Sequence, residues 1–345
     1  MEANFHLIGP NCMGIFNPKF GVKQSKEQYS GFAGKVGLIS QSGTHAVVFA
    51  SEAHLEGIDI NKSVSFGNGV VLDSADYLEY FGRDPEIKAI GMYLEGVRDG
   101  RQFLRVLREV SALKPVVIWK GGRTEEGGRA IASHTGSLVV PQAIWDAAVR
   151  QFGAINVSRM EELIDTLKAL LYLSPVRGDR VAVAGGSGGQ SVAIADVFAE
   201  AGLRVPLLTQ ESYDKLATFF SLVGASCRNP IDPGSNRREL GRILEILVQD
   251  ANIDNLVLLI TTRFGITRRL ESHINSLVGI KPKTSKPVMA ILSHSFSSGE
   301  VEQTGGIIRE LQNGGVPTFI TLERGARALK NALDYYRLKG SLGSQ

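Results

Sequence analysis

The residues best suited to chemistry gather in one glycine-rich stretch, Lys120–Ser137, which reads KGGRTEEGGRAIASHTGS. Its histidine, His134, is flanked by Ser133, Thr135 and Gly136. A histidine in such a stretch can act as a base, a nucleophile or a metal ligand. A histidine that only hydrogen-bonds its neighbours fits the same residues, so the stretch alone leaves both interpretations open.

The residues before this stretch indicate where it lies. It follows the apolar run Pro115–Trp119, which is typical of a buried strand. Its five glycines, with no Leu or Val, favour a long ordered loop over a helix or a strand. Loops that leave the carboxyl ends of parallel strands are where α/β proteins keep their reactive groups.

Two further segments share one design: VGLISQSGTHAVVFASEAHLEGI, which begins at Val36, and VAVAGGSGGQSVAIADVFAEAGL, which begins at Val181. Each predicts a strand, a turn of small residues, a helix and a glycine stop. The first N–H groups of a helix lack internal partners, and the helix dipole is positive there. Each turn is therefore a candidate phosphate-binding site, with these members: Ser42, Gly43 and Thr44 in the first copy, and Gly186, Ser187, Gly188 and Gly189 in the second.

A single turn of this kind is weak evidence, because glycine and serine there also serve tight packing. Two copies together with the histidine stretch are more specific. If two domains pack pseudo-symmetrically, both helix N-termini can face one site with His134 between them. Two positive dipole ends suit a phosphorylated imidazole.

Alternating strands and helices predict the α/β class, with parallel sheets covered on both faces. We expect two flavodoxin-like, doubly wound parallel-sheet domains, the first with strand order 2-1-3-4-5. The expected strands of the first domain are 36–40, 60–66, 87–94, 116–119 and 155–157. Those of the second are 180–184, 204–208, 255–260, 288–292 and 318–320.

A Pro/Gly-containing break, SPVRGD, predicts a domain boundary near residue 175. The domains are then expected at 35–175 and 176–345. Residues 1–34 show no regular period and are predicted to be a linker from a preceding domain. Phe5–Ile8 within it could be the last strand of that domain.

The composition excludes several classes of protein. Apolar residues make up 43% and charged residues 21% of the chain, which is typical of a folded globular protein rather than a disordered one. A net charge of +3 is too small to indicate nucleic acid or a membrane surface as a partner. Two cysteines exclude a disulfide framework, and no cluster has metal-ligand spacing, so we expect a cytoplasmic protein without a resident metal.

Several motifs resemble the NDP-forming acyl-CoA synthetases, which include ADP-forming acetate–CoA ligase and are related to succinyl-CoA synthetase. The matching motifs are ISQSGT, YLEGVRDGRQF, KGGRTEEGGRAIASHTGSL, GPNCMGIFNP, VAVAGGSGGQSVAIAD, NPIDP and GVPTFITLERGARAL. They extend over essentially the whole chain. The resemblance implies that GPNCMGIFNP follows a CoA-binding domain and that residues 1–34 are its exit.

The resemblance also implies a reaction. An acyl-CoA and phosphate give an acyl phosphate and CoA, the phosphoryl group passes to His134, and the phosphohistidine then phosphorylates ADP or GDP. Glu95 matches the glutamate that pairs with that histidine, although a surface or helix-capping carboxylate is the alternative. Magnesium would enter with the nucleotide. The implied partners are an ATP-grasp subunit or domain, a CoA-binding domain and a short-chain or aromatic carboxylic acid, and an oligomer is expected.

Two rival functions stay open. The chain could be a catalytically incomplete module that binds acyl-CoA or nucleotide as a sensor or scaffold, although His134 in an intact SHTGS motif disfavours this. It could also be an acyltransferase without phosphate chemistry, whose activity would survive the loss of His134. A Rossmann dehydrogenase is disfavoured, because neither glycine turn gives G-x-G-x-x-G followed by a ribose-binding acid.

Overall fold

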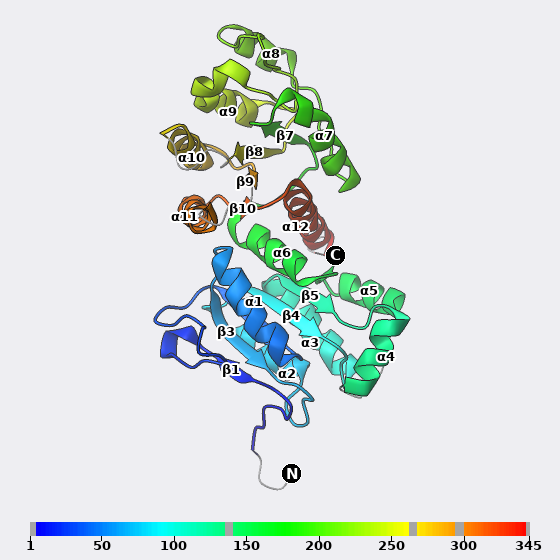
Figure 1. The fold of residues 1–345 in the computed structure, drawn as a ribbon. Helices are drawn as coiled ribbons and strands as arrows, with labels where there is room; N and C mark the ends of the chain where they lie inside the picture. The colour runs from blue at the N-terminus through cyan, green and yellow to red at the C-terminus, as the bar shows by residue number, and fades with distance from the viewer. Residues whose placement is uncertain (1–4, 135–140, 262–267, 294–299, 343–345) are drawn as a thin grey trace. The chain divides into compact units, whose positions relative to one another are not determined.

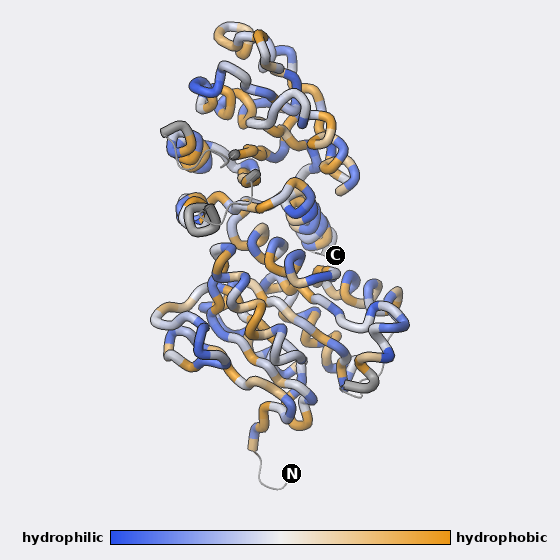
Figure 2. Tube along the Cα trace, in the orientation of Figure 1, coloured by the Kyte–Doolittle hydropathy of each residue, from blue (hydrophilic) through white to orange (hydrophobic). Residues whose placement is uncertain are grey.

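The computed structural model describes residues 5–134, 141–261, 268–293 and 300–342. The chain divides into two compact units, the first formed by Met1–Leu171 and Leu338–Gln345, and the second by Tyr172–Arg337 (Figure 1). Hydrophobic residues concentrate along the strands of both units (Figure 2). None of the described helices is both long and apolar enough to cross a bilayer.

The first unit contains a six-stranded sheet with the order β1-β3-β2-β4-β5-β6. Its strands are β1 (Gly14–Phe16), β2 (Val36–Ser40), β3 (Ile60–Ser65), β4 (Ala89–Leu94), β5 (Val116–Lys120) and β6 (Ile155–Val157). Apart from β1, all are parallel, and β3-β2-β4-β5-β6 is the expected 2-1-3-4-5 order. The predicted flavodoxin-like topology of this unit is confirmed.

Helices cover both faces of this sheet: α1 (Gly43–Leu55), α2 (Ser74–Arg83), α3 (Gly100–Leu113), α4 (Glu125–His134), α5 (Gln142–Gln151) and α6 (Met160–Tyr172). Alternate strand residues such as Ile39 and Met92 share one core with α2, α3 and α5. On the opposite face, Gly91 leaves room for Leu163 and Leu167 of α6. Since side chains alternate along a strand, strands buried on both faces are apolar throughout, as the sequence pattern indicated.

The start of the chain differs from the prediction. Phe5–Ile8 forms no strand, whereas Gly14–Phe16 forms β1 and pairs antiparallel with Ser63–Ser65 of β3. The short 3-10 helix η1 (Pro18–Phe20) follows. Part of the expected linker is therefore an edge strand of the first sheet.

The stretch 120–137 is also not the predicted loop, because Glu125–His134 forms α4. The Thr124 hydroxyl caps the helix by accepting from the Gly127 N–H at 3.1 Å. Glu125 pairs with Arg129 one turn later, and Ile131 is buried. Capping, an i,i+4 ion pair and one buried anchor together outweigh the cost of the glycines, which is about 1 kcal/mol each in a helix interior.

The second unit contains a parallel four-stranded sheet with the order β10-β9-β8-β7. Its strands are β7 (Val181–Ala184), β8 (Asn255–Thr261), β9 (Val288–Ser293) and β10 (Thr318–Phe319). Its helices are α7 (Ser191–Glu200), α8 (Gln210–Ala217), α9 (Leu240–Gln249), α10 (Arg268–Ile280), α11 (Glu300–Asn313) and most of α12 (Leu322–Leu342), with 3-10 turns η2 (Gly188–Gln190), η3 (Gly234–Glu239) and η4 (Lys281–Lys283). Residues of α8, α9, α10 and α11 share one core with alternate residues of β7, β8 and β9.

The strand predicted at 204–208 is wrong, because that segment makes only an isolated bridge between Arg204 and Arg180. The free edge of β7 is instead met by residues from the NPIDP motif. The Asn229 side chain accepts from the Val183 N–H and donates to the Val181 carbonyl, and Ile231 bridges to Ala184. Because these groups satisfy the backbone of β7, a neighbouring strand is not needed there.

Candidate active site

The candidate site of the first unit lies where three neighbouring parallel strands end. Gln41–Thr44 follow β2, Glu95 follows β4, and Lys120 ends β5. The sheet order β2-β4-β5 places these ends side by side. The topology therefore brings two predicted site elements, the first serine-glycine turn and Glu95, to one edge of the sheet.

The first turn is closed by its own serines. The Ser42 side chain is the N-cap of α1 and accepts from the His45 N–H at 3.3 Å. Ser40 Oγ donates to the Ser42 carbonyl at 2.6 Å and accepts from its N–H at 3.2 Å. Within the described ranges, the N–H groups of Gly43 and Thr44 have no acceptor, as expected of a helix start that could receive an anion.

Gly43 has a packing role that its sequence position did not indicate. A Cβ atom at this position would lie 2.5 Å from Met13 Cγ. Glycine here therefore makes room for the segment that leads into β1. Thr44 beside it is exposed.

Glu95 is 6% exposed, and its backbone is held from the neighbouring strand. Gln41 Oε1 accepts from the Glu95 N–H at 2.7 Å and from the Gly96 N–H at 3.1 Å. The Gln41 N–H in turn donates to the Tyr93 carbonyl at 2.9 Å. One buried amide thus ties the turn after β2 to the turn after β4.

The Glu95 carboxylate accepts a hydrogen bond from the Tyr93 hydroxyl at 3.2 Å. Burial raises the pKa of Tyr93, and the negative charge of Glu95 raises it further, so the phenol stays protonated as the donor. A Cβ atom at position 121 would lie 2.8 Å from this hydroxyl, which makes Gly121 the residue that the arrangement tolerates best.

Lys120 places a buried ammonium group against the main chain of Glu95. The residue is 1% exposed, and its Nζ donates to the carbonyls of Glu95 at 2.8 Å and Gly121 at 2.6 Å. Burial lowers the pKa of Lys120, whereas the negative charge of Glu95 opposes that shift.

His45 completes an aromatic group at the same edge. Its ring centre lies 4.5 Å from that of Tyr93 and 4.7 Å from that of Trp119. Burial lowers the pKa of His45, and the charge of Glu95 opposes the shift. Burial therefore favours the neutral imidazole of His45, whereas the Glu95 carboxylate favours the protonated one.

His134 is the last residue of α4, and its side chain lies outside the described part of the structure. The same holds for the side chain of Ser133 and for Thr135 and Gly136. The pairing of His134 with Glu95 stays a prediction.

The second turn belongs to the second unit and is closed differently. Ser187 and Gln190 form a capping box around η2. The Asp232 carboxylate accepts from the Gly188 N–H at 2.6 Å and from the Gly234 N–H at 2.9 Å. Gly186 is buried, and Gly189 is exposed with open space beside it.

Sequence reasoning missed four side chains around Glu95: Gln41, Tyr93, Lys120 and His45. Two of them left a usable signal. Tyr93 stands two residues before Glu95 and so shares its face of the strand. Lys120 is a charged residue that ends an apolar strand. The neighbours of Gln41 and His45 come from other strands, so their roles left no local signal.

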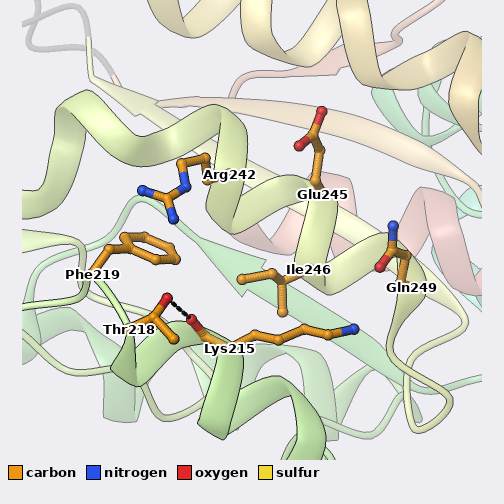
Figure 3. A pocket seen from close by; sticks show the side chains of 7 residues that line it. All are labelled: Lys215, Thr218, Phe219, Arg242, Glu245, Ile246 and Gln249. Atoms are coloured by element: carbon orange, nitrogen blue, oxygen red, sulfur yellow. Dashed lines mark hydrogen bonds between the residues drawn. The ribbon is translucent and has the colours of Figure 1, made fainter.

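A hollow between α8 and α9 is separate from these residues. It measures about 280 Å³ and is lined by Lys215, Thr218, Phe219, Arg242, Glu245, Ile246 and Gln249 (Figure 3). The Arg242 guanidinium stacks on Phe219, 3.9 Å from the ring centre. None of the predicted site residues lines it. Across the described ranges, no three His, Cys, Asp or Glu side chains form a group that could hold a metal ion.

Comparison with known proteins agrees with this architecture. Residues 33–170 match the family model described as a succinyl-CoA ligase like flavodoxin domain. The chain is 33% identical over 324 residues to the acetate–CoA ligase (ADP-forming) II subunit alpha of Pyrococcus furiosus, covering 92% of this chain and 68% of that one. It is 31% identical to the ADP-forming acetate–CoA ligase I of Archaeoglobus fulgidus, covering 94% of this chain but 45% of that protein.

Among solved structures, the chain is similar to a dinucleotide forming acetyl-coenzyme A synthetase 1 of Ca. Korarchaeum cryptofilum in complex with phosphate and ADP. The TM-score is 0.82 at 28% identity, and the match covers 98% of this chain and 72% of that one. The chain thus spans about half to seven-tenths of the length of these relatives. On the strength of these matches, the chain belongs to the family of ADP-forming acetate–CoA ligases and related acyl-CoA synthetases.

Proposed function

We propose that this chain is the phosphohistidine-carrying core of an NDP-forming acyl-CoA synthetase. In the reaction, phosphate displaces CoA from an acyl-CoA and leaves an acyl phosphate. A ring nitrogen of His134 then attacks the phosphorus, which breaks the bond to the acyl oxygen and releases the carboxylate. Phosphohistidine finally passes the phosphoryl group to ADP or GDP and regenerates the imidazole. Each step is reversible.

The proposal depends on one observation: Glu95 is buried, and hydrogen bonds hold both its backbone and its carboxylate. Its backbone is held by Gln41 and its carboxylate by Tyr93, at the edge where β2, β4 and β5 end. A carboxylate that hydrogen-bonds one ring nitrogen of a histidine fixes the tautomer and leaves the other nitrogen free to attack. It also stabilises the positive charge that develops on the imidazole. We assign this role to Glu95 toward His134.

The first turn would hold the phosphoryl group. The N–H groups of Gly43 and Thr44 at the start of α1 are available as donors, and the helix dipole adds positive potential. The second turn, with Gly186, Ser187, Gly188 and Gly189, stays a candidate phosphate site of the second unit, in which the Asp232 carboxylate already accepts from the Gly188 N–H. The similar Korarchaeum synthetase forms a complex with phosphate and ADP, which supports phosphate chemistry for this chain.

Further groups are needed for the full reaction. We propose that a CoA-binding domain and an ATP-grasp subunit or domain supply the CoA and nucleotide sites, since the relatives are longer and some are named as alpha subunits. Magnesium would be bound through the nucleotide phosphates. The acid would be a short-chain or aromatic carboxylic acid.

Acid-labile, base-stable phosphate incorporation tests the proposal. The chain and its His134→Ala variant are incubated with labelled acetyl phosphate and, separately, with labelled ATP and magnesium, and the label is located by mass spectrometry. His6→Ala is a matched control, because His6 is an exposed histidine outside the site. We expect label on His134 in the chain and the control but not in His134→Ala.

Absence of label from both donors would call for a second arm with an ATP-grasp partner. Labelling restored by the partner would support an incomplete enzyme. No label even then would favour a module that binds acyl-CoA or nucleotide. Thioester exchange that survives His134→Ala would favour an acyltransferase instead.

A further inference from the structure

Lys120 is a fully buried cation at the end of β5, with 1% of its surface exposed. Burying an ammonium group costs several kcal/mol unless its charge and hydrogen bonds are satisfied. Across the described residues, its hydrogen bonds go to two main-chain carbonyls, those of Glu95 and Gly121, and no carboxylate oxygen lies within ion-pair distance. The ammonium also lies 5.7 Å from the ring centre of Trp145.

The carbonyls of Glu95 and Gly121 show which parts of the backbone Lys120 connects. Glu95 follows β4 and Gly121 follows β5, so the ammonium joins the ends of two neighbouring strands. The other side of the Glu95 residue is already held, because its N–H donates to Gln41. The backbone of Glu95 is therefore fixed at its N–H from the β2 side and at its carbonyl from the β5 side.

A neutral donor could form the same hydrogen bonds, so the choice of a cation needs its own reason. The charge of Lys120 acts on the Glu95 carboxylate through space, because the two opposite charges favour each other. Phosphorylation of a histidine beside Glu95 would bring about two further negative charges to this edge. A fixed buried cation offsets that charge without any movement at the moment of transfer.

We propose that Lys120 is a positioning residue of the phosphoryl-transfer site, which clamps the Glu95 backbone and supplies a fixed positive charge near the Glu95 carboxylate. The proposal rests on the function proposed above for Glu95 and His134. It has two separable parts, the clamp and the charge.

Two variants separate these parts. Lys120→Gln keeps hydrogen-bond donors but removes the charge, and Lys120→Met removes both at similar length. Lys168→Met is the matched control, because Lys168 is another fully buried lysine of the same unit and pairs with Glu56 at 2.9 Å, outside the site. All variants are assayed below their thermal midpoints, so that loss of folded protein is measured and excluded.

The clamp is tested by hydrogen exchange of the Glu95 and Gly96 amides, followed by NMR, which needs no catalysis. We expect Lys120→Met to exchange these amides about tenfold or more faster, with smaller changes in Lys120→Gln and none in Lys168→Met. Unchanged protection in Lys120→Met would overturn the clamp.

The charge is tested by the rate of His134 labelling with acetyl phosphate. We expect the maximal rate to fall about tenfold or more in both Lys120 variants, while the half-saturating concentration changes little. Wild-type labelling in Lys120→Gln would overturn the role of the charge, and an equal fall in Lys168→Met would show a general effect of losing a buried lysine. If the wild-type chain takes no label with or without a partner, the proposed function fails, and amide exchange still decides the clamp.

Discussion

The two serine-glycine turns look alike in sequence, yet their structures differ in what meets the helix start. In the first unit, the Gly43 and Thr44 N–H groups lack an acceptor among the described residues. In the second unit, the Gly188 N–H already donates to the Asp232 carboxylate. The comparison teaches that a phosphate-binding pattern can be filled by the chain's own anion, which sequence similarity between the turns does not reveal.

The same contrast extends to the neighbouring edge of each sheet. Next to β2 lies a complete strand, β3, which pairs along its whole length. Next to β7, the Asn229 side chain and Ile231 take that place. The loop that supplies these two residues also supplies Asp232, so the substitute edge and the built-in anion come from one segment. In the second unit, a loop therefore takes the place of the strand next to β7, and the same loop supplies the carboxylate that binds the Gly188 N–H.

The largest effect, on the rate of His134 labelling, is expected when a carboxylate is introduced into the first turn. Ser42→Asp keeps a good N-cap, so the thermal midpoint should change little. Its carboxylate should repel the phosphoryl group and lower the initial rate of His134 labelling by about tenfold or more.

Ser42→Asn is the control for that change, because asparagine caps equally well without a charge. It should label much faster than Ser42→Asp. Equal rates in the two variants would mean that the first turn does not receive the phosphoryl group.

The substitute edge of β7 can be tested through Asn229, which is buried. Asn229→Ala removes bonds to the Val183 N–H and to the carbonyls of Val181 and Pro206. Leaving buried backbone groups unpaired should reduce the free energy of unfolding by about 2–4 kcal/mol, measured by urea denaturation.

Asn252→Ala serves as the comparison for that loss, since the Asn252 side chain makes one exposed bond to the Leu207 carbonyl. This substitution should lower the free energy of unfolding by well below 1 kcal/mol, because it removes a single exposed hydrogen bond. Similar losses in both variants would argue against a special role for the Asn229 amide at the edge.

The negative charge of Asp232 in the second turn can be removed while an oxygen is kept to accept from the Gly188 N–H. Asp232→Asn should let inorganic phosphate approach the Gly188 N–H and raise its affinity about tenfold, because a like charge is removed. Phosphate titration followed at the Gly188 amide resonance measures this. Asp196→Asn on the exposed face of α7 makes the same change in net charge and should leave the titration unaltered.

The smallest effect, on the stability of the folded protein, is expected at the amino ends of the strands. Both units have a main-chain bond at this place, from Lys88 to Lys35 in the first and from Asp254 to Arg180 in the second. In the second unit the Arg180 side chain also donates to the Asp254 carboxylate, from Nε at 2.9 Å and Nη2 at 2.7 Å. The hydrogen bonds from Arg180 hold the pKa of Asp254 below its usual range.

A carboxyl whose pKa is lower in the folded protein stabilises it above the unfolded pKa, near 4, and loses this contribution as the pH falls through the folded value. The stability difference between the wild type and Asp254→Asn should therefore be about 1 kcal/mol at neutral pH and shrink below about pH 4. Asp214→Asn, at an exposed helix position, should show no such convergence. Thermal melts across this pH range provide the measurement.

Sequence reasoning succeeded where the signal is local and repeated. Apolar strands and amphipathic helices predicted the first sheet and its order, because periodicity reports burial residue by residue. It failed at α4, where glycines suggested a loop. The cap that Thr124 gives to the Gly127 N–H is local, but the burial of Ile131 depends on neighbours in space. It also failed at 204–208, where the edge of β7 is satisfied by a side chain 46 residues later in sequence, as Asn229 pairs with Val183.

By itself, the sequence determined the parallel α/β architecture, the turns at the starts of α1 and α7, and the motifs that mark the family. It also singled out Glu95 and His134, since these stand within motifs that local residues define. Only the tertiary structure decided which distant residues surround Glu95, because Gln41 follows β2 and Lys120 ends β5, whereas Glu95 follows β4. It likewise decided that Asp232 closes the second turn. Contacts between distant segments depend on sheet order and on the close approach of backbones, and no local pattern of residues records either.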